Sequence, residues 1–278
     1  MVIGIVGLGL IGGSLAKAVK ARTGHTVYAY DTDNETMLLA RMWNAYDAVL
    51  TKDNTGECDM IFVALRPQYA VDYVAENAEY IAKGAILTDL CGVKRAVYAP
   101  FHKYADKYKF TYIGAHPMAG KERQGFGNAV ESLFDSASVI LTPDGTATPE
   151  ALERLDRFFT DIGFARMVYS DPEKHDKMIA FTSQMPHIIS SSYIKSPRAQ
   201  EHRGYSAGSF CDMSRVAFLD ENMWTELFVD NADNLEEELS LMIDNLEKFR
   251  EALTSRDAAA LCALLREGRE KKITAGGS

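Results

Sequence analysis

The strongest indication of the fold in this chain is VIGIVGLGLIGGSLAKAV, residues 2–19. Its apolar start predicts a buried strand, and three glycines, Gly7, Gly9 and Gly12, follow in G-x-G-x-x-G spacing before a helical pattern begins. In such a turn the first glycine allows a sharp bend, the second lets the backbone approach a pyrophosphate, and the third permits close contact between helix and strand. The N-terminus of the helix offers unpaired N–H groups to the phosphates. The stretch therefore predicts a dinucleotide site formed by Gly7, Leu8, Gly9, Leu10, Ile11 and Gly12.

A carboxylate follows at the end of the second predicted strand, TVYAYD, nineteen residues after Gly12. Asp31 can accept hydrogen bonds from the ribose hydroxyls of the cofactor, and its charge would repel a 2′-phosphate. The next three residues, TDN, contain no arginine that could bind such a phosphate. We therefore expect NAD rather than NADP. A structural glycine turn beside a surface aspartate is the alternative interpretation.

Strands and helices alternate along the first 170 residues. Apolar runs predict strands at residues 2–8, 26–31, 60–65, 85–90, 110–116, 138–143 and 165–170. Helical patterns lie between most of them. This alternation predicts an α/β fold, a Rossmann-type doubly wound and mainly parallel sheet with helices on both faces, at residues 1–170.

The pattern changes after residue 170, where only helical periodicity remains. Apolar residues recur every three or four positions at Leu235, Leu239, Met242, Leu246, Phe249 and Leu253. We expect an all-helical domain at residues 171–278, whose apolar stripe packs internally or against a second copy of the chain.

Composition excludes several classes of protein. The net charge is −9 and no basic patch occurs, which argues against a nucleic-acid partner. The cysteines are scattered, so neither a zinc site nor a disulfide framework is indicated, and free thiols fit a reducing cytoplasm. The apolar N-terminus has no basic leader and no cleavage site, so we expect neither a signal peptide nor a membrane span.

In a sheet of this kind the ligand binds at the carboxyl ends of the strands. This rule gathers around one cleft the segments that hold Leu65, Arg66 and Pro67, Asp89 to Gly92, and His116, and we expect Leu65, Arg66, Pro67, Asp89 and Gly92 to contact the cofactor. A dehydrogenase that oxidises an alcohol needs a base for the hydroxyl proton, and the ordinary pKa of histidine, about 6.5, suits that task. His116 is therefore the candidate base. A histidine that only caps a turn is the alternative.

The segment HDKMIAFTSQMPHIISSSY, residues 175–193, adds regularly spaced polar residues to an apolar helix. Asp176, Ser183 and His187 lie at i, i+7 and i+11, within about 20° of one helix face. Pro186 should kink this helix. We interpret the shared face as the wall of a polar cavity, although His187 taken alone would more often be a core histidine.

Arg215 stands in a mostly apolar helical segment, SAGSFCDMSRVAF, and an arginine there needs an anion. Ser209 and Asp212 resemble a capping box that starts this helix, and Asp212 could be an internal partner for the guanidinium. A substrate carboxylate that is bound by both arms of the guanidinium is the functional alternative.

These residues together resemble the prephenate dehydrogenase family, which includes arogenate and cyclohexadienyl dehydrogenases. The matching segments follow the family's order over nearly the whole chain: GLGLIGGS, DLCGVK, GAHPMAGKE, HDKMIAFTSQMPH, GSFCDMSRVA and then Trp224. HPMAG combined with SQMPH is more specific than the glycine motif. The resemblance implies NAD(P)-dependent oxidative decarboxylation of prephenate to 4-hydroxyphenylpyruvate, and a homodimer formed through the helical domain.

The resemblance also implies roles for individual residues. His116 matches the catalytic histidine, which is hydrogen-bonded to the C4 hydroxyl of the substrate ring. His187 matches a histidine of the substrate pocket, and Arg215 matches the arginine that binds a substrate carboxylate. Three further residues match positions in the pocket, behind it or near its entrance: Ser183, Asp176 and Glu122.

Two positions depart from the family pattern. Many members have DVGSVK where this chain has DLCGVK, so the serine that contacts the catalytic histidine becomes Gly92. Either water replaces that hydroxyl, or Cys91 or another group holds the imidazole of His116. Leu219 stands where some members have a serine.

Three alternatives stay open. Arogenate has an amino group in place of the side-chain keto oxygen of prephenate; a hydrogen bond from His187 to the keto oxygen would favour prephenate, and a pocket carboxylate facing that group would favour arogenate. A 3-hydroxyacid dehydrogenase would use a lysine of the helical domain, but neither Lys177 nor Lys195 lies in that family's motif. A non-catalytic NAD sensor would have lost the catalytic positions, whereas His116, His187 and Arg215 remain. The reaction requires no metal, and the sequence shows no ligand set for one.

Overall fold

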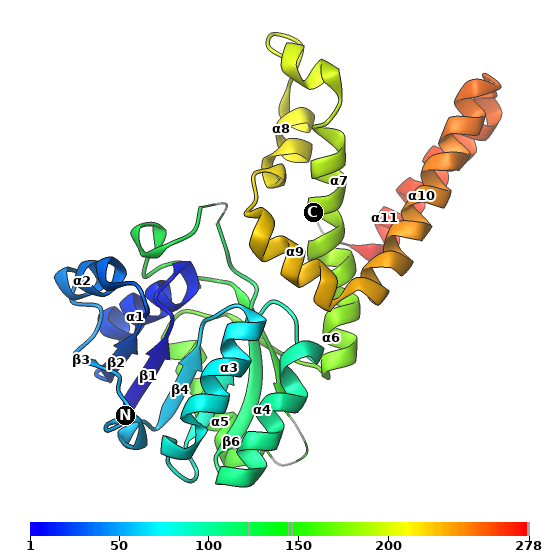
Figure 1. Ribbon diagram of the computed structural model, residues 1–278. Helices are drawn as coiled ribbons and strands as arrows, with labels where there is room; N and C mark the ends of the chain where they lie inside the picture. The colour runs from blue at the N-terminus through cyan, green and yellow to red at the C-terminus, as the bar shows by residue number, and fades with distance from the viewer. Residues whose placement is uncertain (122, 144, 146, 277–278) are drawn as a thin grey trace. The chain divides into compact units, whose positions relative to one another are not determined.

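The computed structural model of the chain (Figure 1) describes residues 1–121, 123–143, 145 and 147–276. Its centre is one eight-stranded sheet with the order β3-β2-β1-β4-β5-β6-β7-β8. Neighbouring strands are parallel except for β6 and β7, which are antiparallel. The strands are β1 (Val2–Val6), β2 (Thr26–Tyr30), β3 (Ala48–Val49), β4 (Met60–Val63), β5 (Ile86–Asp89), β6 (Thr111–Pro117), β7 (Ser138–Pro143) and β8 (Arg166–Tyr169).

Helices cover both faces of the sheet, and α3 and α4 lie side by side over one of them (Figure 1). These helices are α1 (Leu10–Arg22), α2 (Asn34–Met42), α3 (Pro67–Asn77), α4 (Arg95–Tyr108) and α5 (Pro149–Asp161). The predicted fold class, a Rossmann-type mainly parallel sheet followed by helices, is confirmed.

The apolar run of β4 explains why both faces are covered. Met60 and Phe62 belong to the core cluster that includes residues of α1 and α5, whereas Ile61 and Val63 belong to the cluster with residues of α3 and α4. Successive side chains of a strand point to opposite faces, so a strand between two helical layers must be apolar at every position. The ring of Phe62 stacks on that of Phe158 in α5 with 4.7 Å between centroids.

After β8 every regular element among the described residues is helical: α6 (Pro172–Ile179), α7 (Met185–Tyr193), α8 (Gly208–Ser214), α9 (Glu221–Asp230), α10 (Ala232–Thr254) and α11 (Ala258–Ala275), with short 3-10 turns between some of them. A π-helical turn, Ala180–Gln184, joins α6 to α7, where the sequence predicts a single helix kinked at Pro186. Proline has no N–H to donate to the carbonyl one turn back, and the wider turn lies immediately before it. The predicted capping box is wrong: α8 starts at Gly208 after Ala207, so Ser209 lies inside the helix and no side chain caps it.

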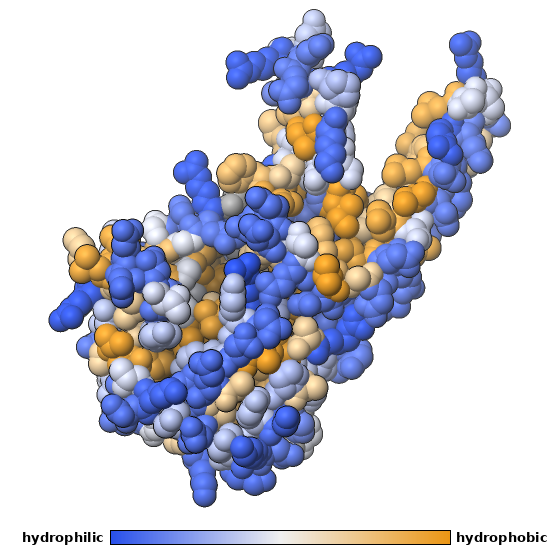
Figure 2. Space-filling view, viewed as in Figure 1, coloured by the Kyte–Doolittle hydropathy of each residue, from blue (hydrophilic) through white to orange (hydrophobic). Residues whose placement is uncertain are grey.

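The chain forms two compact units, Met1–Asn231 and Ala232–Ser278. In the second unit α10 packs against α11, and the carboxylate of Asp257 caps α11. Apolar side chains stay exposed along this helix pair (Figure 2): Leu241, Ile243, Leu246, Leu253, Leu265 and Ile273. The predicted domain boundary near residue 170 stays a prediction. In the structure α6 to α9 belong to the first compact unit. Within the described residues, no helix combines the length and the apolar character that crossing a membrane would require.

Candidate active site

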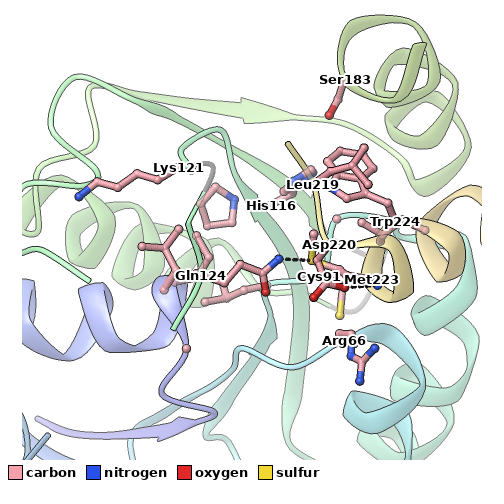
Figure 3. Close-up of a pocket in the computed structure, with 18 of the residues that line it drawn as sticks. Arg66, Cys91, His116, Lys121, Gln124, Ser183, Leu219, Asp220, Met223 and Trp224 are labelled. Carbon is pink, nitrogen blue, oxygen red and sulfur yellow. Dashed lines mark hydrogen bonds between the residues drawn. The ribbon is translucent and has the colours of Figure 1, made fainter. Parts of the chain in front are cut away.

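A cavity of about 620 Å³ lies at the carboxyl ends of β1, β4, β5 and β6, inside the first compact unit. Its sheet side consists of residues 9–11, 64–67 and 90–92, together with His116 and the loop that follows it. Its helical side consists of residues from the end of α6, the π-helical turn, α7, α9 and the segment between α8 and α9. Figure 3 shows the ring of His116 among these side chains. This is the cleft that the rule for parallel sheets predicts.

The glycine turn provides a cradle whose shape depends on missing side chains. Gly7 has a φ of +84°, and a Cβ built at Gly12 would lie 1.9 Å from the carbonyl oxygen of Gly7. A Cβ built at Gly9 would meet no protein atom within 4 Å, so the backbone there is open. Helix α1 begins at Leu10 without a side-chain cap, and Gly9, Leu10 and Ile11 line the cavity. An uncapped helix N-terminus beside bare backbone fits a pyrophosphate.

Asp31 connects this turn to the end of β2. Its Oδ2 accepts a hydrogen bond from the N–H of Leu8 at 2.7 Å, and its Oδ1 accepts one from the N–H of Asp33 at 2.9 Å. Each carboxylate oxygen keeps a lone pair with which it can bind a ribose hydroxyl. Leu8 itself does not line the cavity, because its side chain is buried in the core and its N–H is bound to Asp31. That Leu8 contacts the cofactor stays a prediction, as it does for Gly7 and Gly12, which do not line the cavity either.

Four of the five cofactor residues that were predicted from the other strand ends line the cavity, namely Leu65, Arg66, Pro67 and Gly92. Asp89 does not, and this prediction is corrected. Its carboxylate is fully buried and binds the ammonium of Lys94 at 2.5 Å, the N–H of Cys91 at 2.9 Å and the hydroxyl of Tyr112 at 2.7 Å. A buried charge requires such compensation, so the oxygens of Asp89 serve the fold and not a ligand.

His116 is the penultimate residue of β6, and its ring borders the cavity. Its Nδ1 lies 2.9 Å from Nε2 of His175 in α6. Burial, and then the nearby His175 and Lys94, lower the pKa of His116 well below its ordinary value. The imidazole is therefore neutral at neutral pH, which is the form that can accept a proton.

His175, for which the sequence predicts no role, and Asp176 lie next to His116 in a buried hydrogen-bonded series. Nδ1 of His175 lies 2.7 Å from Oδ1 of Asp176, and both side chains are almost completely buried. The Asp176 carboxylate also accepts the N–H groups of Lys94 and Arg95 at 2.7 and 2.9 Å, where α4 starts without a cap of its own. Asp176 does not line the cavity, where the shared helix face would place it; it lies behind the wall, which is among the places that the resemblance implies. His175 and Asp176 are adjacent in the sequence, but nothing in the sequence shows that His175 contacts His116, 59 residues away.

The helical wall contains two of the three residues that were predicted to share a face. Ser183 and His187 line the cavity, whereas Asp176 does not, because the π-helical turn between them changes the register that an α-helix would have kept. Nδ1 of His187 donates to the carbonyl oxygen of Ser183 at 2.8 Å, and the ring packs on Trp224 with 3.7 Å between centroids. Burial lowers the pKa of His187, the Ser183 carbonyl opposes this, and Arg215 adds to it. A neutral His187 with its proton on Nδ1 can only accept at Nε2.

Arg215, in a short 3-10 turn (Arg215–Ala217), also lines the cavity, as do Leu219 and Asp220. Glu122 lies outside the described residues. Two glutamines of the cavity have no predicted role: Gln184, although it lies in the matching segment SQMPH, and Gln124, which no motif or periodicity marks. Gln184 is buried and donates to the carbonyl of Leu227, and Gln124 reaches the sulfur of Met223 in α9 at 3.4 Å (Figure 3).

The buried histidines predict how stability depends on pH. The pKa values of His116 and His175 are both lowered, in each case first by burial, so the unfolded chain binds protons below about pH 6.5 that the folded chain does not. We expect the free energy of unfolding to fall as the pH drops below about 6.5, by at most about 1.4 kcal/mol per pH unit for each histidine. Urea unfolding at pH 7.5, 6.5 and 5.5 measures this slope. His116→Asn should have a shallower slope, and equal slopes would contradict the prediction.

Family models match both parts of the chain. The model described as "Prephenate dehydrogenase, nucleotide-binding domain" matches residues 15–169, and the one described as "Prephenate dehydrogenase, dimerization domain" matches residues 171–267. Together they extend over most of the sequence.

Individual proteins with similar sequences or structures have related names. A cyclohexadienyl dehydrogenase of Zymomonas mobilis is 32% identical over 98% of this chain and 94% of its own length. The structure of a Synechocystis arogenate dehydrogenase superposes with a TM-score of 0.82 at 26% identity, covering 99% of this chain and 100% of that one. A prephenate dehydrogenase from A. aeolicus has the same fold, with a TM-score of 0.86 at 24% identity and coverage of 99% and 98%.

Proposed function

The chain belongs to the prephenate dehydrogenase family, and we propose that it catalyses the NAD-dependent oxidative decarboxylation of prephenate to 4-hydroxyphenylpyruvate. The observation that carries this proposal is the position of His116, whose neutral imidazole borders the same cavity as the dinucleotide cradle. A reaction that removes a hydride and a hydroxyl proton together needs these two features side by side.

The residues of the cradle fit NAD. Gly7 and Gly12 bring strand and helix close together, and Gly9 with the start of α1 would hold the pyrophosphate. Asp31 would accept the ribose hydroxyls and repel a 2′-phosphate. When bound there, NAD would supply the acceptor for the hydride that leaves C4 of the substrate ring.

The side chains of the cavity supply the remaining chemistry. Neutral His116 accepts the proton of the C4 hydroxyl as the C4–H bond breaks, which produces a dienone. The C1 carboxylate then leaves as CO2, its bonding electrons enter the ring to form an aromatic phenolate, and the phenolate oxygen takes a proton. Arg215 binds a substrate carboxylate and so sets the position of C4.

A single assay tests the proposal. NADH formation is followed by absorbance with prephenate and arogenate supplied separately, and then again with NADP in place of NAD. Turnover of prephenate with NAD, and much weaker turnover with NADP, is the expected result. No turnover of either substrate by a chain that binds NAD would refute the proposed activity.

Arogenate is the second candidate substrate, and two observations favour it. Nε2 of a neutral His187 can accept a hydrogen bond from an ammonium group but cannot donate one to a keto oxygen, contrary to the donor role expected from the sequence. Asp220 adds a carboxylate to the cavity wall, and its Oδ1 accepts the N–H of Met223 at 2.7 Å. The two substrates differ only at the group that such acceptors would contact, so the assay above separates them.

Replacing Arg215 should mainly weaken substrate binding. A charge-assisted hydrogen bond contributes about 1.5–3 kcal/mol, so we expect Arg215→Gln to raise the KM for prephenate about 10- to 100-fold. The NAD affinity should not change, since the guanidinium is assigned to the substrate. Steady-state kinetics with Arg215→Lys as a charge-conserving control checks this. An unchanged KM in Arg215→Gln would exclude the carboxylate-binding role.

We also propose that residues 171–278 form the dimerisation domain, with residues 1–170 binding the cofactor. The exposed apolar side chains of α10 and α11 support a homodimer, because large apolar side chains that gather on one helix pair often mark an interface. Light scattering should give twice the chain mass of 30.8 kDa. A mass equal to one chain at micromolar concentration would contradict the dimer.

A further inference from the structure

Three side chains form a hydrogen-bonded series that begins at the cavity and ends behind its wall. Nδ1 of His116 lies 2.9 Å from Nε2 of His175, and Nδ1 of His175 lies 2.7 Å from Oδ1 of Asp176. The exposed fractions of His175 and Asp176 are 1% and 0%. Neither residue lines the cavity, so only His116 can touch a ligand there.

The buried end determines the direction of the series. Burial opposes ionisation of Asp176, but the hydrogen bonds from His175, Arg95 and Lys94 hold the pKa of its carboxyl below the ordinary value. An ionised carboxylate can only accept, so His175 has its proton on Nδ1 and its lone pair on Nε2. That lone pair accepts the proton on Nδ1 of His116. The remaining lone pair of the His116 ring is then on Nε2.

Gly92 lies at the Nε2 edge of the His116 ring. A Cβ built at Gly92 would lie 3.9 Å from Nε2 of His116, so a hydroxyl on that carbon could reach the nitrogen. Glycine has no such group. Among the residues that the structure describes, the one hydrogen bond of the His116 ring is the bond to His175. The orientation of the imidazole therefore depends on its Nδ1 side.

We propose that His175 and Asp176 are positioning residues, which hold His116 in the Nδ1–H tautomer with the Nε2 lone pair at the cavity and so replace the hydroxyl that position 92 lacks. The proposal rests on the proposed role of His116 as proton acceptor. When Nε2 accepts the substrate proton, the resulting imidazolium keeps its bond to His175, and the Asp176 carboxylate stabilises the charge through that ring.

The backbone keeps this series in place. The two oxygens of Asp176 accept the N–H groups of Lys94 and Arg95 at the start of α4, and the side chain of Asn231 donates to the carbonyl oxygen of Asp176. The carboxylate is thus oriented by α4 and cannot rotate without breaking a helix cap. The ring of His175, and through it the ring of His116, is therefore held by a carboxylate of fixed orientation.

The test compares His175→Leu with His175→Gln. Leucine removes the acceptor for Nδ1–H of His116, whereas the side-chain carbonyl of glutamine can restore it. We expect His175→Leu to lower kcat by roughly 10²-fold, since an imidazole in the wrong tautomer cannot serve as base, and to leave the KM and NAD affinity nearly unchanged. His175→Gln should recover most of that loss. His25→Leu is the matched control and should leave kcat unchanged. His25 precedes β2 at the amino end of that strand and does not line the cavity.

A second readout needs no substrate. Nitrogen-15 NMR of the histidine-labelled enzyme reports the tautomer of each of the six histidines, and His116 is identified by the signal that His116→Asn lacks. The expected result is the Nδ1–H form in the unmodified enzyme and in His175→Gln, and a shift toward the Nε2–H form in His175→Leu. Since this measurement is independent of turnover, it tests the positioning even if prephenate and arogenate are both inactive.

Three outcomes would overturn the proposal. One is an unmodified enzyme whose His116 has its proton on Nε2. Another is His175→Leu with the kcat of the unmodified enzyme. The third is equal loss of kcat in His175→Leu and His175→Gln with an unchanged tautomer of His116, which would show that His175 serves only the packing of α6.

Discussion

His116→Asn turns over prephenate at least about 10²-fold more slowly than the unmodified enzyme, while NAD and prephenate still bind. The expected loss is that of a general base, because the asparagine amide cannot accept the hydroxyl proton at neutral pH. His116 is the proposed acceptor because its ring reaches the cavity and because burial holds its pKa well below the ordinary value, so it is neutral and ready to accept. Single-turnover kinetics at saturating NAD separates the chemical step from binding.

The matched control for this substitution is His25→Asn. His25 is also partly buried and packs against the ring of Phe158, but it precedes β2 at the amino edge of the sheet. The control should keep the full kcat. A His116→Asn enzyme with near-normal kcat would mean that another group removes the proton, and the assignment of His116 would be wrong.

Gly12→Ala and Gly9→Ala should separate the two functions of the glycine turn. A Cβ at Gly12 would lie 1.9 Å from the carbonyl oxygen of Gly7 and 3.0 Å from the Cβ of Ala64, so there is no room for it. We expect Gly12→Ala to lower the free energy of unfolding by about 3 kcal/mol, the upper part of the usual range for overpacking, and to abolish measurable NAD binding. The midpoint temperature of thermal unfolding of the ligand-free protein should fall by roughly 6 °C or more.

Gly9 gives the opposite combination. Its φ of −65° is ordinary for any residue, and a Cβ there meets no protein atom within 4 Å. The free energy of unfolding of Gly9→Ala should therefore stay within about 0.5 kcal/mol of that of the unmodified protein. The new methyl group would stand where the backbone must approach the pyrophosphate, so the Kd for NAD should rise at least about tenfold. Melting curves and NAD titration measure the two effects. Normal NAD affinity in Gly9→Ala would place the pyrophosphate elsewhere.

The site could be predicted from the sequence to the extent that local features encode it. Leu65, Arg66, Pro67 and Gly92 are expected at the cleft because each lies at or just after the end of a predicted strand, and all four line the cavity. Asp89 follows the same rule and fails, since Lys94 and Tyr112 enclose its carboxylate in the core. The position of a residue at a strand end does not tell whether its side chain turns toward the cleft or into the protein.

The helical wall shows a second limit. An ideal α-helix through residues 175–193 brings Asp176, Ser183 and His187 to one face, but the π-helical turn at Ala180–Gln184 breaks that register. Ser183 and His187 keep their place at the cavity, and Asp176 instead caps α4. One wider turn, which no residue pattern marks clearly, thus changes the function of a residue.

The α/β fold, the dinucleotide cradle and the histidine at the cleft can all be predicted from the amino-acid sequence. Each of these follows from spacing along the chain: glycines in one turn, apolar residues with the period of a strand or a helix, and a residue at a strand end. Only the tertiary structure decided what holds that histidine. His116 and His175 are 59 residues apart, and their contact depends on how α6 packs against β7 and α4 and on a buried carboxylate that binds the start of α4. Local periodicity sets which elements form, whereas the partner of a buried polar group is set by the packing of elements that are distant in sequence.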